Sequence, residues 1–451
     1  MGYRRGLSSP LLPSLRLLLL LAAAWLVLLL LLVPSPAVAT PINSAQAAVL
    51  VECAAAWGRT FSGWNVGGDC ANAQFISCDG TGLITAMSLD AKQLVGSIPT
   101  ALGTLTSLTT LNLSSNSLEN PIPDSFSNLV SLASLNLSRN ELSGAIPPTI
   151  GALTSLQQLL LSQNKLTGNI PTEMGKLLRL QSLYLDYNQL SGVIPSTFGQ
   201  LKQLTWLSLA YNSLTAILDD LTPLGNLVGL DVSHNIITGT IPSAISALTR
   251  LTALMLDYNQ LDSPIPQGFS ALTALKLIDL KSNNFAEALP PVFFTKMKSV
   301  QYMSLGENDF TGSIPTSMTS LTSLTHLDLG STKLAGPIPT VITKMGHLSY
   351  LDVAIDTLYG SIPATMGSML NLQFLLVNPS ATPCGTAGRC EVVQYSGTAF
   401  CRDCSNFCDT CIKVKPAPGK CKKQRRPCPK NPCRGRLCIP YVFSCKGYKC
   451  L

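Results

Sequence analysis

Leucine and other apolar residues recur along most of the chain with a period of about 24 residues. One column runs Leu105, Leu129, Leu153, Leu177, Leu201, Leu224, Leu248, Leu272, Met297, Leu321, Met345 and Met369. Each period repeats the pattern Leu-x-x-Leu-x-x-Leu-x-Leu-x-x-Asn-x-Leu, as it does from Leu129 to Leu142. The alternating leucines predict a short strand with an inward apolar side, and stacked repeats must share one core. The pattern therefore predicts a solenoid of twelve repeats from about Thr81, with a partial thirteenth that ends near Asn378.

A column of asparagines marks the point where each predicted strand must turn. It comprises Asn116, Asn140, Asn164, Asn188, Asn212, Asn235, Asn259, Asn283 and Asn308. A buried amide there can satisfy backbone groups of the turn, which are costly to leave unpaired. We therefore interpret this column as structural and not catalytic. Thr332 and Asp356 replace the asparagine in the last two full repeats, which predicts looser turns there.

A Gly-x-Ile-Pro motif follows the predicted strand in many repeats, at Gly96–Pro99, Gly144–Pro147, Gly168–Pro171, Gly192–Pro195, Gly239–Pro242, Gly312–Pro315 and Gly360–Pro363. With this motif, residues 45–378 resemble the plant-type leucine-rich repeats of receptor-like kinases, receptor-like proteins and polygalacturonase-inhibiting proteins. The resemblance implies an α/β leucine-rich-repeat solenoid with a curved, parallel concave sheet that serves extracellular recognition. The sequence has no kinase domain and no long insertion between repeats. In the repeat Leu201–Pro223, Ala216–Asp220 replaces the motif, which predicts a local kink of the convex side.

The start of the repeat region predicts a helical cap. Asn43 or Ser44 can cap a helix whose inner face carries Ala47, Leu50, Val51 and Ala54, and which stops near Gly58. Trp57 and Trp64 are candidate core residues of this cap. The resemblance implies a disulfide between Cys70 and Cys78. Cys53 is left over, either as a buried free thiol or as one half of an intermolecular disulfide.

The N-terminus has the pattern of an export signal. Arg4, Arg5 and Arg16 flank the entry to the uncharged run Leu17–Val33, and Ala37-Val38-Ala39 fits a cleavage site. The alternative is an uncleaved segment that anchors the chain in a membrane. The predicted organisation is a signal peptide at 1–39, a cap at 40–80, repeats at 81–378 and a basic, cysteine-rich tail at 379–451.

The tail differs from the repeats in cysteine content and charge. It holds twelve cysteines, from Cys384 to Cys450, and export predicts that they form a disulfide-rich module. The alternative is zinc, because Cys401-x-x-Cys404 and Cys408-x-x-Cys411 have the spacing of zinc ligands. From Cys384 onward, 14 basic residues stand against 3 acidic ones, whereas residues 40–383 carry 14 basic and 21 acidic residues.

The basic residues of the tail are candidates for binding acidic polysaccharide or another polyanion. They are Lys420, Lys422, Lys423, Arg425, Arg426, Lys430, Arg434 and Arg436. The alternative is a charged tail that is merely solvated. Nucleic acid is not expected as a partner of an exported protein.

Outward strand positions of the concave sheet give a candidate ligand site in the middle and later repeats. Its residues are Tyr184, Asp186, Tyr187, Trp206, Tyr211, Asp231, His234, Asp257, Tyr258 and Tyr302. Aromatic side chains bury a large area at low entropic cost, and their exposed rings can stack on sugar or peptide groups. Asp279, His326, Asp328 and Tyr350 extend the same face. The alternative is that these are ordinary polar choices for an outward position.

Two glycosylation sequons start at Asn112 and Asn136, on outward positions of early strands. Glycans there would cover the first coils and leave the central patch open. No known catalytic motif is present, and the pairs His234 with Asp231 and His326 with Asp328 lack an obvious nucleophile. We expect no enzymatic activity, no cofactor and no metal.

The sequence as a whole therefore predicts a secreted recognition protein whose concave face binds a protein, peptide or glycan, with a membrane receptor as one candidate partner, in signalling or defence. The alternatives are an inhibitor of a hydrolase that degrades the cell wall, and a structural wall protein held by its basic tail.

Overall fold

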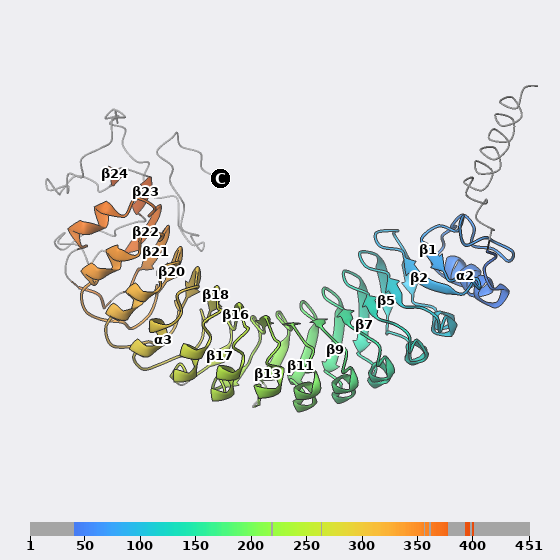
Figure 1. The fold of residues 1–451 in the computed structure, drawn as a ribbon, viewed down its shortest axis with the longest axis horizontal. Coiled ribbons are helices and arrows are strands. Elements are labelled where there is room, and N and C mark those ends of the chain that lie inside the picture. Colours follow the sequence, from blue (N-terminus) through green and yellow to red (C-terminus); the bar gives the residue numbers. More distant parts are fainter. Residues whose placement is uncertain are drawn as a thin grey trace, which may run out of the picture.

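The computed structural model describes residues 40–217, 220–262, 264–355, 357–359 and 362–377, and the backbone of two strands at 393–396 and 399–400. These residues form one curved solenoid that runs from an N-terminal cap to the last coil (Figure 1). The predicted signal peptide and most of the predicted tail lie outside the described residues. Within the described ranges, no helix has the length and apolar character that crossing a membrane requires.

The concave face is a 16-stranded sheet in the described part of the chain. Its parallel strands are β2 (Ile84–Ser88), β4 (Thr110–Asn112), β6 (Ser134–Asn136), β8 (Gln158–Leu160), β10 (Ser182–Tyr184), β12 (Trp206–Ser208), β14 (Gly229–Asp231), β16 (Ala253–Met255), β18 (Leu277–Asp279), β19 (Tyr302–Ser304), β20 (His326–Asp328), β21 (Tyr350–Val353) and β22 (Phe374–Val377). Neighbouring strands pair in register, so that Leu183 lies between Leu159 and Leu207. These leucines are buried, and burying one such side chain contributes roughly 1.5–3 kcal/mol. The predicted solenoid with a parallel concave sheet is confirmed.

The asparagine column closes each coil, as the sequence predicts. The Asn259 amide donates hydrogen bonds to Leu256 O of its own coil and to Val232 O of the preceding coil. Its Oδ1 accepts a hydrogen bond from Ile237 N, also in the preceding coil. One buried side chain thus satisfies backbone groups of two coils. The Thr332 hydroxyl donates only within its own coil, to Leu329 O, and Asp356 lies outside the described residues.

Short helical turns cover the convex side, and most of them are 3-10 helices. They are η1 (Thr100–Thr104), η2 (Asp124–Asn128), η3 (Pro148–Ala152), η4 (Thr172–Lys176), η5 (Ser196–Gln200), η6 (Thr222–Leu224), η7 (Ser243–Ala247), η8 (Gln267–Ala271), α3 (Pro291–Thr295), η9 (Thr316–Ser320), η10 (Thr340–Lys344) and η11 (Ala364–Ser368). Pro99 precedes η1 with φ −64°, the value that a proline ring imposes. Phe126, Phe198 and Phe269 lie on these turns and are fully buried, so the convex side contributes its own apolar layer.

A second parallel sheet follows the asparagine turns and stops in the middle of the solenoid. Its strands are β3 (Val95–Ser97), β5 (Ser117–Asn120), β7 (Glu141–Ala145), β9 (Lys165–Asn169), β11 (Gln189–Val193) and β13 (Ser213–Ala216). The glycine of Gly-x-Ile-Pro has a positive φ there, for example +76° at Gly192. Ala216 replaces that glycine in the next coil, and a residue with a Cβ adopts a positive φ at a cost. The sheet ends at this departure, and in the described residues it is followed by the pair β15 (Thr238–Gly239) and β17 (Gln260–Leu261) and by isolated bridges.

Both ends of the concave sheet carry antiparallel strands. At the start, helix α2 (Ser44–Ala56) is capped by Asn43, whose side chain accepts hydrogen bonds from Ala45 N and Gln46 N. Strand β1 (Ile76–Cys78) pairs with β2. At the other end, β23 (Val393–Ser396) pairs with β22, and β24 (Ala399–Phe400) pairs with β23. The sheet therefore continues past the last coil into the predicted tail.

The cap matches most of its sequence prediction. Cys70 and Cys78 form a disulfide, and Cys53 is a buried free thiol. Trp57 and Trp64 are buried. The prediction was wrong for Val51, which is 44% exposed. Cys53 and Gln46 take part in the buried face instead, and Gln46 Oε1 accepts a hydrogen bond from Ile84 N of the first coil.

The hydrogen bonds that the asparagine column makes between coils predict a contribution to the free energy of unfolding. Asn259→Ala should lower the free energy of unfolding by about 2–4 kcal/mol, because it leaves buried backbone groups of two coils without partners. Chemical denaturation followed by circular dichroism measures this effect. The matched control is Asn169→Ala at an exposed position, where we expect a change within about 0.5 kcal/mol. Equal effects of the two substitutions would contradict the structural role of the column.

Candidate functional site

Four ring-bearing residues stand directly before the asparagines of consecutive coils. Tyr187, Tyr211, His234 and Tyr258 all have left-handed backbones, with φ between 51° and 54°. The backbone of each turn is held by the asparagine that follows, and the amide of Tyr211 also donates to Ser233 O of the next coil. The sequence prediction placed these four residues on strands. The structure corrects this, because they lie in the turn just beyond the strand end.

These four rings form one continuous stack along the solenoid, here called the turn stack. Ring centroids lie 4.1 Å apart for Tyr187 and Tyr211, 3.9 Å for Tyr211 and His234, and 4.3 Å for His234 and Tyr258. The rings are within 13° of parallel. Their inner faces therefore cover one another, and mainly the ring edges and polar atoms remain for a ligand. The expectation that exposed rings stack on sugar or peptide groups stays a prediction, with fewer ring faces available than the sequence suggested.

A second stack starts two coils further on and uses a different column of the repeat. Tyr302, His326 and Tyr350 begin strands β19, β20 and β21, with ring centroids 4.3 Å and 4.0 Å apart. This strand stack stands at the opposite end of the strands from the turn stack. Only Tyr302 of these three belongs to the ten candidate residues. The signal that could have revealed both stacks is the recurrence of rings at one repeat position in successive coils.

Trp206 begins β12, the strand whose following turn carries Tyr211 of the turn stack, at the strand position that Tyr302 occupies later. Its indole lies nearly parallel to Tyr184, with a centroid distance of 6.4 Å. A Cβ on Gly229 would stand 2.3 Å from two indole carbons. The indole therefore fills the space that a side chain at position 229 would take, so this glycine determines where Trp206 can lie.

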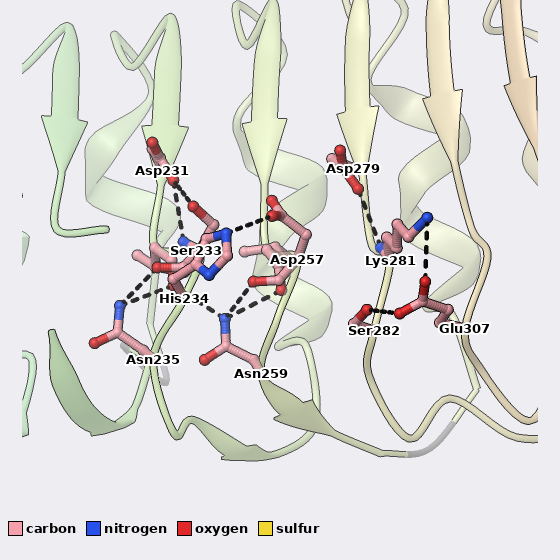
Figure 2. A network of polar contacts seen from close by, with 12 residues as sticks. Asp231, Ser233, His234, Asn235, Asp257, Asn259, Asp279, Lys281, Ser282 and Glu307 are labelled. Atoms are coloured by element: carbon pink, nitrogen blue, oxygen red, sulfur yellow. Dashed lines mark hydrogen bonds and ion pairs between the residues drawn. The ribbon is translucent and has the colours of Figure 1, made fainter. Parts of the chain in front are cut away.

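Three aspartates lie on consecutive coils, Asp231, Asp257 and Asp279 (Figure 2), and Asp257 is 3.7 Å from His234 of the turn stack. We call them the carboxylate triad. Burial raises the pKa of Asp257 to about 6, and burial together with the nearby Asp257 raises the pKa of Asp279 to about 6. Burial also raises the pKa of Asp231. The sheet therefore holds partly buried carboxylates that are costly to ionise.

Lys281 separates the triad from the acidic residues of the later coils. Its ammonium lies 3.3 Å from Glu307 and 3.1 Å from Asp328 (Figure 2 shows the Glu307 pair). Although burial lowers it, these two carboxylates raise the pKa of Lys281 above its usual range. Asp328 was predicted to be an exposed partner of His326. It is instead buried, and it also accepts hydrogen bonds from Gly330 N and the Ser304 hydroxyl.

Each histidine interacts electrostatically with the aspartate of its predicted pair, His234 with Asp231 and His326 with Asp328. His234 Nε2 lies 3.7 Å from Asp257 of the next coil, and its ring is held between two tyrosines. Burial lowers the pKa of both His234 and His326. Within the described ranges, no group of three or more His, Cys, Asp or Glu side chains has an arrangement that could hold a metal ion. The arrangement offers polar edges, carboxylates and one indole, which are groups suited to binding.

The remaining candidate residues lie apart from the turn stack. The Asp186 carboxylate accepts a hydrogen bond from the Ser162 hydroxyl, in an open hollow that extends from Ser114 to Asp186 on the concave side. Asn112 and Asn136 are partly exposed at the ends of β4 and β6, and each accepts a hydrogen bond from the serine of its own sequon. The eight basic candidates of the tail lie outside the described residues.

Comparison with protein families gives one match. A family model described as "Leucine rich repeat" matches residues 84–142, 106–166, 178–237, 225–285 and 275–334, which together cover more than half of the chain. A comparison with curated proteins gives no significant match.

Several solved structures are similar to this chain. The Arabidopsis receptor kinase HAESA, in complex with the peptide hormone IDA and the co-receptor SERK1, is 32% identical with a TM-score of 0.66, over 75% of this chain and 58% of that chain. The plant peptide hormone receptor RGFR1 in complex with RGF2 is 29% identical with a TM-score of 0.57, over 65% and 54%. The chain thus spans little more than half the length of these receptor structures.

The triad predicts an unusual pH dependence of stability. A carboxyl group whose pKa is higher in the folded than in the unfolded protein stabilises the fold at low pH, and this contribution is lost as pH rises through the folded value, here about 6. Asp279→Asn should therefore raise the free energy of unfolding at pH 7 by about 1 kcal/mol, after allowance for solvent screening.

Chemical denaturation at several pH values measures this effect. The difference in the free energy of unfolding between Asp279→Asn and the unmodified chain should become smaller as pH falls toward about 4. Glu119→Gln, at an exposed position, is the matched control and should change stability by less than about 0.5 kcal/mol at every pH. A variant that is destabilised at pH 7 would contradict the argument.

The position of Trp206 yields a separate prediction. Gly229→Ala should displace the indole, because its Cβ would approach indole carbons to 2.3 Å. We expect a changed tryptophan emission spectrum with the fold retained. Gly225→Ala is the control, since nothing lies within 4 Å of a Cβ there, and an unchanged spectrum for both variants would refute the packing described.

Proposed function

This chain belongs to the leucine-rich-repeat family, in its plant-type form, and on that basis we propose that it is an extracellular recognition protein without catalytic activity. Its concave face would bind a peptide or a segment of a protein across the central coils. The receptor structures that resemble it were determined with peptide hormones bound, which supports a ligand of this kind. The family fold alone does not specify the ligand, so the proposal depends on the surface of this particular chain.

The turn stack is the observation that carries the proposal. Tyr187, Tyr211 and Tyr258 are each more than a third exposed, although apolar ring surface is normally covered. Exposed rings that are already fixed lose little conformational entropy when a partner covers them. Their mutual stacking fixes them before binding. The exposed edges of these rings carry hydroxyl and imidazole groups. Such groups are better suited to hydrogen bonds with a peptide backbone than to the stacking of a ring on a sugar.

The carboxylate triad adds a preference for positive charge. Its aspartates are partly buried, and their ionisation opposes folding at neutral pH. A lysine or arginine side chain of a ligand would stabilise the ionised form. Side chains that cost stability in the free protein are typical of functional sites.

Selection from a random library of short peptides, with the intact protein as bait, tests this function. A selected peptide should bind Tyr211→Ala at least about 10-fold more weakly than the unmodified chain, because truncation of a central aromatic residue typically costs more than 1 kcal/mol. Isothermal titration calorimetry measures the affinities.

The matched control removes an exposed apolar side chain elsewhere. Val193 is 55% exposed on β11 of the second sheet, and Val193→Ala should leave the affinity unchanged. Peptides that bind Tyr211→Ala and Trp206→Ala as tightly as the original chain would exclude the central coils as the binding site.

A further inference from the structure

The carboxylate triad has no lysine or arginine partner among the described residues. Asp231 accepts hydrogen bonds from the Ser233 amide and hydroxyl, and Asp279 accepts one from the Lys281 amide. Asp257 is 3.7 Å from His234, and burial lowers the pKa of this imidazole. The three aspartates are on consecutive coils and open to the concave side (Figure 2).

The nearest lysine in the described ranges forms no ion pair with the triad, although its charge offsets part of the rise that burial causes in the pKa of Asp257. Lys281 follows Asp279 on the same coil, but its ammonium pairs with Glu307 and Asp328 of the later coils. Lys281 therefore forms its ion pairs with carboxylates of later coils, whereas the three aspartates beside the turn stack have no ion pair with a lysine or arginine in the described residues. Partly buried charges interact more strongly than exposed ones, because solvent and salt screen them less.

The chain carries a complementary segment near the end of this same sheet. Residues 413–436 hold ten lysines and arginines and no aspartate or glutamate. Strands β23 and β24 extend the concave sheet beyond β22, so the chain leaves the solenoid at the edge of the concave face. Asp279 of the triad lies on β18, six strand spacings from β24 in the order of the sheet, which corresponds to about 29 Å.

The connecting chain is long enough for contact. Nineteen residues lie between Phe400 and Lys420, and a chain of this length reaches at most about 3.3–3.6 Å per residue, which exceeds that distance. Tethering also makes the encounter intramolecular, which raises the effective concentration of the basic segment at the triad above that of a separate molecule. Modest ion pairing is then sufficient to keep the contact populated.

We propose that the basic segment 413–436 of this chain docks on the carboxylate triad and occupies the central concave face. The contact is within one chain, and it stands whether or not the concave face binds a peptide. An external ligand must displace this segment. A polyanion that binds the basic residues draws the segment away and leaves the concave face open. The ten cations exceed the three carboxylates, so the docked segment keeps positive charge for other partners.

Zero-length carbodiimide cross-linking of the intact protein tests the contact, because it joins a lysine amine to a carboxylate only when the two groups touch. Mass spectrometry should find links from Lys420, Lys422 or Lys423 to Asp257 or Asp279. A mixture of isotope-labelled and unlabelled protein should give links within single molecules only. In about 1 M salt, where the Debye length is about 3 Å, the yield should fall at least about 5-fold.

Variants of the full chain provide the controls. Replacing Lys420, Lys422 and Lys423 with glutamate should abolish protection of the triad, seen as increased carbodiimide labelling of Asp257 and Asp279 by a small amine. Lys446→Glu with Lys449→Glu, at basic positions outside the segment, should leave that labelling unchanged. Circular dichroism verifies that each variant folds. If a variant does not fold, the salt dependence of the cross-link yield in the unmodified chain tests the proposal instead.

Three outcomes would overturn the proposal: links confined to carboxylates outside the concave face, such as Asp124 or Glu141; links only between molecules; or a link yield that salt does not change.

Discussion

Each amide of the asparagine column bonds to two successive coils, and this shared hydrogen bonding sets the register of the whole solenoid. Because Asn259 ties Val232 to Leu256, the leucines of adjacent coils are brought into direct contact and the rings before the asparagines are brought into line. The turn stack is thus a by-product of a structural requirement. The left-handed residue before each asparagine must project outward, and this chain places a ring there in four consecutive coils.

The sequence predicted the fold well because the determining signal is repeated many times. The leucine period, the asparagine column and the proline motif all indicate the same solenoid. A departure from the pattern in one repeat therefore changes the predicted fold little. The cap was also predictable, apart from Val51, since local capping chemistry and a cysteine pair define it. The 3-10 geometry of the convex turns was not predicted, because the sequence cues for short helical turns do not distinguish the two helix types.

The candidate site was predictable only in part. The ten residues were found from their position in the repeat, but the turn residues Tyr211 and His234 were assigned to strands. Stacking between coils depends on ring orientation, which a single repeat does not reveal. The burial of Asp328 was missed for a related reason. Lys281, two coils before it, reaches across to its carboxylate, and contacts between residues 47 positions apart leave no local pattern.

The end of the second sheet at Ala216 has a consequence for how the solenoid comes apart. Before this point, neighbouring coils are joined by two hydrogen-bonded ladders; beyond Leu261, the described residues continue with one ladder and isolated bridges such as Ala288 with Thr311. In a linear array, cooperativity is the product of such nearest-neighbour couplings. The C-terminal coils should therefore open as a separate folding unit at lower free energy, with faster amide hydrogen exchange than the N-terminal coils. Fraying would then reach the strand stack before the turn stack, so the two aromatic surfaces belong to regions of different local stability.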